Sequence, residues 1–181
     1  LTGYLRFATE GYWVTLGWPG RTALTLAGAI GLVYLGQQGF LRAREYVLLE
    51  RVENLNRSVD KGFAALKEIQ TQMETAEEID LEAMAKLVRE IYAAQTAEIE
   101  ALRKACAVEP MNFETTYKLG FALWHLGRQD RGERRRELIE EAMDWFGTGM
   151  RLNPFNAYNY LRYGMSLHDL KRHEEAGPYF D

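Results

Sequence analysis

Pro110-Met111-Asn112, followed by Leu119-Gly120, decides the fold, because the chain repeats this stretch as Pro154-Phe155-Asn156 followed by Tyr163-Gly164. Proline cannot continue the helix before it, and asparagine is a preferred cap for the helix after it. Each copy therefore predicts a turn between two helices, with a glycine midway along the second helix. The chain is expected to be all-α.

A further helical pattern follows each copy, with a small residue and an aromatic residue four positions apart: Ala142 and Phe146, then Ala176 and Phe180. Gly120 and Gly164 allow the two helices of each pair to approach closely, and the aromatic side chains are expected to fill the remaining space. The arrangement resembles the tetratricopeptide repeat (TPR), whose helix pairs stack into an α-solenoid. That resemblance implies a protein–protein interaction module at residues 110–181.

The length of the repeat departs from the family pattern. The two glycines, like the two prolines, lie 44 residues apart, whereas TPRs recur about every 34 residues. About ten extra residues are therefore expected between the two helices of the first repeat, near residues 127–136. The second repeat is interpreted as truncated by the end of the sequence.

The N-terminal part contains a candidate membrane-spanning helix. Residues 1–21 are rich in aromatic side chains, and an uncharged stretch then begins at Thr22 and ends at Leu41. Its length of about 20 residues matches the hydrocarbon core of a bilayer. Arginines flank it, and their excess on the C-terminal side predicts that the repeats are cytoplasmic. The alternative is the buried helix of a soluble protein, which Gln37 and Gln38 favour.

Residues 42–109 are predicted to form a stalk of two antiparallel helices that also caps the repeats. Apolar residues at steps of three and four define a stripe on the first helix: Leu48, Val52, Leu55, Val59, Phe63, Leu66, Ile69 and Met73. A second helix is expected from about Leu81 to Ala107, ending before Pro110. A short coiled coil is the alternative. Glu98 stands where the second helix of a TPR would carry a small residue.

The composition disfavours several classes of function. The formal net charge of −4 argues against a nucleic-acid partner held by bulk charge. Cys106 is the only cysteine, and we expect it to be a small apolar residue on a packed helix. His168 and His173 are five residues apart, which does not place two ligands on one helix face. No metal site, catalytic residue or cofactor is predicted.

In repeats of this family the first helices line a concave groove, and the corresponding residues form the candidate partner-binding site: Tyr117, Phe121, Trp124, Tyr158, Arg162, Met165 and His168. An aromatic and methionine lining suits an apolar peptide or helix. The alternative is that some of these residues, Phe121 and Met165 in particular, pack against neighbouring repeats.

The expected insertion carries a second candidate surface with five arginines: Arg128, Arg131, Arg134, Arg135 and Arg136. Such a segment can lie on anionic lipid head groups or hold a phosphate-bearing partner. The alternative is a solvated helix start whose arginines pair with the interspersed acidic residues.

The order of segments along the chain is an aromatic approach, the candidate span, an acidic stalk and the repeats, one of which reads Asn153-Pro-Phe-Asn-Ala-Tyr158. This order resembles the C-terminal tails of bacterial O-antigen ligase or polymerase proteins. That resemblance implies a bacterial inner-membrane protein of polysaccharide assembly whose catalytic part lies upstream. No catalytic residue is carried over to these residues. The alternative is a stand-alone TPR adaptor, soluble or membrane-anchored, unrelated to glycans.

Overall fold

A computed structural model describes residues 6–7, 12–13, 17–73 and 81–180, and the chain divides into two compact units, Leu1–Arg42 and Ala43–Asp181. The expected break between the stalk helices, at residues 75–80, and most of the aromatic N-terminal segment lie outside the described residues. Two antiparallel strands of two residues each, β1 (Arg6–Phe7) and β2 (Tyr12–Trp13), depart from the all-α prediction. Every other element described is helical.

Helix α1 (Trp18–Met73) begins in the first unit and continues into the second. By length and composition alone, its N-terminal part could cross a membrane as a stretch of 18 residues or more. No residue of that stretch is buried against a described part of the chain.

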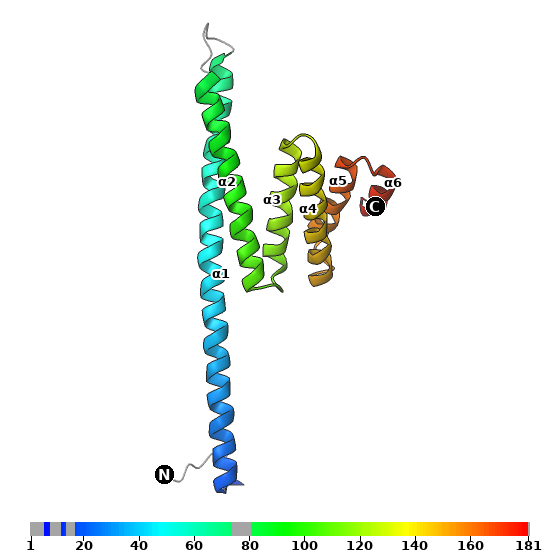
Figure 1. Cartoon of the computed structure of the whole chain (residues 1–181). Helices are drawn as coiled ribbons and strands as arrows, with labels where there is room; N and C mark the ends of the chain where they lie inside the picture. Colours follow the sequence, from blue (N-terminus) through cyan, green and yellow to red (C-terminus); the bar gives the residue numbers. More distant parts are fainter. Residues whose placement is uncertain (1–5, 8–11, 14–16, 74–80, 181) are drawn as a thin grey trace. The chain divides into compact units, whose positions relative to one another are not determined.

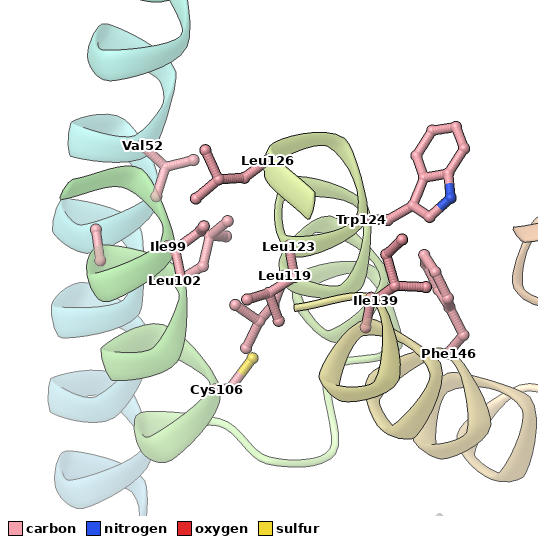
Figure 2. Close-up of a cluster of buried hydrophobic side chains, with 12 residues drawn as sticks. Val52, Ile99, Leu102, Cys106, Leu119, Leu123, Trp124, Leu126, Ile139 and Phe146 are labelled. Carbon is pink, nitrogen blue, oxygen red and sulfur yellow. The ribbon is translucent and has the colours of Figure 1, made fainter. Parts of the chain in front are cut away.

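The second unit continues with helices that alternate in direction along the chain (Figure 1). Their bounds are α2 Leu81–Val108, α3 Phe113–Gln129, α4 Glu133–Leu152, α5 Ala157–Asp169 and α6 His173–Ala176, followed by the 3-10 turn η1 Gly177–Tyr179. Figure 2 shows the core, with Val52, Ile99 and Leu102 on one side of α3 and Ile139 and Phe146 on the other. The buried Cys106 side chain belongs to this core, as predicted.

The asparagine caps form as the sequence predicts. Asn112 Oδ1 accepts hydrogen bonds from the backbone N–H groups of Glu114 (3.0 Å) and Thr115 (3.3 Å) at the start of α3. Asn156 Oδ1 accepts one from the N–H of Tyr158 (3.0 Å) at the start of α5. These bonds satisfy backbone donors that the first turn of a helix leaves unpaired.

The predicted glycine–aromatic packing is present in both repeats. A Cβ atom added at Gly120 would lie 2.8 Å from Phe146 Cε1, and one added at Gly164 would lie 3.2 Å from Phe180 Cε1. The two glycines thus face equivalent aromatic rings, which confirms the repeat register. Residues 110–180 form a TPR-like fold.

The ten extra residues do not form a loop. Both repeats join their helices by three-residue turns, residues 130–132 and 170–172. Helix α3 has 17 residues where α5 has 13, so four of the extra residues lengthen α3 and the other six lengthen the start of α4. Gly127 allows this longer pair to stay in contact, since its Cβ would lie 2.9 Å from Ile139 Cγ1.

The second helix of the last repeat is shorter than predicted. Helix α6 ends at Ala176 and the chain continues as a 3-10 turn that contains Pro178. Proline has no backbone N–H to continue an α-helix. Phe180 nevertheless reaches the glycine of its partner helix.

Candidate partner-binding groove

Aromatic side chains follow one face of α3, at positions that helical spacing brings together. The ring of Tyr117 stacks on Phe121 with centroids 6.1 Å apart, and Phe121 lies 5.8 Å from Trp124 and 6.1 Å from His125. Tyr117 and Phe121 are partly buried and also pack on the core, so the packing alternative holds for part of their surface.

Helix α5 contributes an arginine to this aromatic face. The guanidinium carbon of Arg162 lies 4.8 Å from the ring centroid of Phe121 and 4.7 Å from that of Trp124, distances typical of cation–π contacts. Its Nη1 lies 3.6 Å from Met165 Sδ, and its buried Nε has no hydrogen-bond partner in the described structure. Tyr158, which is 65% exposed, lies 6.2 Å from Tyr117. These contacts therefore continue the aromatic face from α3 to α5, where the candidate groove was expected.

Trp124 does not line an open surface, contrary to the sequence expectation, because its side chain is only 3% exposed. The Arg162 guanidinium and that of Arg128, 4.8 Å from the ring centroid, both lie over the indole. The indole N–H donates to Asp169 Oδ2 (2.9 Å), and Arg128 Nε lies 3.7 Å from the same oxygen. Trp124 therefore locks the two repeats together instead of facing a partner.

His168 also differs from the expected arrangement. It is exposed on α5, and its ring lies edge-on to His173 with the centroids 4.5 Å apart. The turn between α5 and α6 brings the pair together, which an argument based on a single helix face did not anticipate. In the described part of the chain, no group of three or more His, Cys, Asp or Glu residues is placed to hold a metal ion.

His125 belongs to the groove, although the sequence analysis did not select it. Its Nδ1 lies 3.1 Å from Gln129 Nε2 and 3.4 Å from Gln95 Nε2, and its ring is edge-on to Phe63 of α1 at 6.3 Å. Burial lowers the pKa of His125, and the positive charges of Arg128 and Arg162 lower it further, so the imidazole is neutral at pH 7. Its spacing of four residues from Phe121 was the signal that would have identified it. Through His125 the aromatic face extends from α5 across α3 to α1.

Two of the five arginines of this segment, Arg128 and Arg134, form ion pairs within the protein, with Asp169 and Asp130. Arg134 Nε lies 3.6 Å from Asp130 Oδ2, and Arg135 Nη2 donates to the backbone oxygen of Asp169 (3.3 Å). Arg131 and Arg136 are exposed at the turn between α3 and α4 and the start of α4. A shallow depression of about 350 Å³ lies here, lined by Gly132, Arg135, Arg136, Asp169, Leu170 and Lys171. The segment is a helix start rather than a free loop.

Glu98 is buried in the stalk, where the sequence analysis expected a small residue. The residue is 8% exposed, and burial raises the pKa of its carboxyl to about 7, while a hydrogen bond to Asn56 opposes the rise and the charge of Asp60 adds to it. Gly62 makes room for the facing helix, because its Cβ would lie 2.5 Å from Ile91 Cγ1. The stalk helices therefore pack against each other around a titratable group.

No protein-family model matches the chain, and no curated protein matches it either. Solved structures with similarity include MamA AMB-1, at 24% identity over 84% of this chain and 68% of that chain, with a TM-score of 0.41. A crystal structure of MamA is similar at 18% identity over 80% and 84% of the two chains, also with a TM-score of 0.41. TM-scores of this size are too low for the likeness to carry an argument about function.

Proposed function

We propose that this chain is a non-catalytic scaffold that holds a protein partner in the groove formed by α1, α3 and α5. The observation that supports this most directly is the aromatic face from Phe63 through His125 and Phe121 to Tyr158, which spans three helices. Aromatic and arginine side chains dominate the binding energy of protein interfaces. An apolar helix or peptide with an acidic side chain to meet Arg162 is the partner that this chemistry fits.

Site-specific photocrosslinking in the native cell tests the groove. A crosslinking amino acid in place of Tyr158 is expected to give a discrete protein adduct, because this side chain is 65% exposed within the groove. The same amino acid in place of Lys104, which is exposed on α2, is the matched control. Arg162→Ala is expected to weaken the Tyr158 adduct. Equal adducts from both positions, insensitive to Arg162, would exclude the groove as the binding site.

The scaffold is further proposed to be held at a membrane by residues 22–41. Eight large apolar side chains of this stretch are exposed: Leu24, Leu26, Ile30, Leu32, Val33, Tyr34, Leu35 and Phe40. Such a surface is far larger than a water-soluble protein normally exposes, and lipid is the simplest cover for it. Resistance of the full chain to carbonate extraction is the expected result, and a soluble monodisperse chain would refute the anchor.

The role in O-antigen or other envelope polysaccharide assembly, in a bacterial inner membrane with cytoplasmic repeats, stays a prediction from the sequence resemblance. The comparisons give it no support. The alternative function, a TPR adaptor unrelated to glycans, would use the same groove. The sequence that precedes Leu1 in the whole protein distinguishes this adaptor from a polysaccharide-assembly protein. Many further hydrophobic spans upstream would favour the polysaccharide protein.

A further inference from the structure

Two large apolar side chains occupy equivalent turns and have no role in the core. Met111, in the turn between α2 and α3, is 71% exposed, and Phe155, in the turn between α4 and α5, is 96% exposed. Each follows a proline and precedes the asparagine that caps the next helix. Because stabilisation by apolar side chains requires burial, Phe155 contributes almost nothing to folding where it stands.

Both turns lie at one end of the second unit. Helices α3 and α4 are antiparallel, so the turn before α3 and the turn after α4 meet at the same end, as Figure 1 shows. The turns between α3 and α4 and between α5 and α6 lie at the opposite end. The two apolar tips therefore face the same side of the repeats.

This end is tied to the start of the second unit by a buried carboxylate. Asn112 Nδ2 donates to Glu45 Oε1 (2.7 Å), and the Thr115 hydroxyl lies 3.4 Å from the same oxygen. Glu45 follows Leu41, the last residue of the candidate span, by only four positions, and four residues reach at most about 14 Å. The carboxylate that holds this turn is therefore only four residues along the chain from the end of the candidate span.

We infer that Met111 and Phe155 insert into the interfacial layer of the bilayer that residues 22–41 are proposed to cross. This inference rests on the membrane anchor proposed above. Charges of both signs lie near the two turns, with Arg42, Arg44 and Arg151 against Glu109 and Glu114. The contact is therefore apolar rather than electrostatic, and it forms on zwitterionic lipid with little dependence on salt.

Helix α3 has 17 residues, which at about 1.5 Å per residue separates its two ends by about 26 Å. Arg131 lies at the turn that follows α3, at the opposite end of the repeats from Met111. It therefore provides a distant reference position on the same unit.

Depth-dependent quenching of a fluorescent label tests the inference on the full chain in phosphatidylcholine vesicles. Burial raises the pKa of the Cys106 thiol to about 11, so the native cysteine reacts slowly and a new cysteine is labelled selectively. Met111→Cys and Phe155→Cys are the test variants. Arg131→Cys, at the opposite turn, carries the same label as the matched control for any insertion driven by the fluorophore.

Labels at positions 111 and 155 are expected to be quenched by brominated lipid and protected from aqueous iodide at least about threefold relative to position 131. If the chain floats with the vesicles but all three labels are equally open to iodide, the inference is wrong and the anchor stands. Equal quenching of all three by lipid also overturns it, because the unit then lies flat on the bilayer. If the chain does not float at all, it is the anchor that fails.

Discussion

Replacing Glu98 by glutamine is expected to stabilise the second unit at neutral and alkaline pH. The carboxyl of Glu98 lies buried between the stalk helices, hydrogen-bonded to Asn56 and near Asp60. Ionisation in this site requires removing a negative charge from water and placing it beside another. Glutamine resembles the protonated carboxyl in shape and carries no charge.

The size of the effect follows from the raised pKa. A folded-state pKa of about 7 against an ordinary 4.5 means that the folded protein retains a proton that the unfolded chain has lost. Stability is therefore highest below pH 4.5 and falls as the pH rises through 7. The full difference is about 3 kcal/mol, at 1.36 kcal/mol for each pKa unit. For a unit of this size it corresponds to a Tm change of roughly 6–12 °C.

Thermal unfolding followed by circular dichroism at pH 4 and pH 8 measures this effect in the full chain. The Glu98→Gln variant is expected to match the parent at pH 4 and to exceed its Tm at pH 8. Glu100→Gln, an exposed neighbour on the same helix, is the control for general charge effects. A Tm difference between Glu98→Gln and the parent that is the same at both pH values would refute the argument from burial.

Two further predictions, each with a matched variant, concern the repeats. Gly120→Leu is expected to cost at least the 1–3 kcal/mol typical of overpacking, because its Cβ would lie within 3 Å of the facing aromatic ring, whereas Gly147→Leu, where the nearest atom is 3.8 Å away, is expected to be tolerated in thermal melts. A Gly120→Leu variant that melts like the parent would show that the repeat register is wrong. Asn112→Ala is expected to lower the free energy of unfolding by about 2–3 kcal/mol, and Asn156→Ala by about 1 kcal/mol. Both variants lose a helix cap, but only Asn112→Ala also loses a hydrogen bond to the buried Glu45. If urea unfolding gives the same loss of stability for both variants, the hydrogen bond to Glu45 does not add to the stability of the first repeat.

The features that were predictable from sequence are those set by neighbours along the chain. A proline and a capping asparagine act within four residues, and the glycine–aromatic pairing follows from a motif that the chain writes twice. These local rules placed the turns and the repeat register correctly.

The features that were missed depend on side chains from distant elements. Trp124 is covered because Asp169 and Arg162, about 40 residues further on, converge on it. The pairing of His168 with His173 requires the turn between two helices, and spacing on one helix says nothing about it. The ten extra residues of the first repeat were visible in the sequence. The burial of Gly127 against α4, which accompanies the helical conformation of those residues, was not.

The Glu45 contact also determines how a pulling force would travel through the molecule. A partner held in the groove and drawn away from the membrane would load α3, and Asn112 and Thr115 would pass that load to α1 near Glu45. With the proposed anchor at residues 22–41, this contact places the mechanical link between partner and anchor within four residues of Leu41.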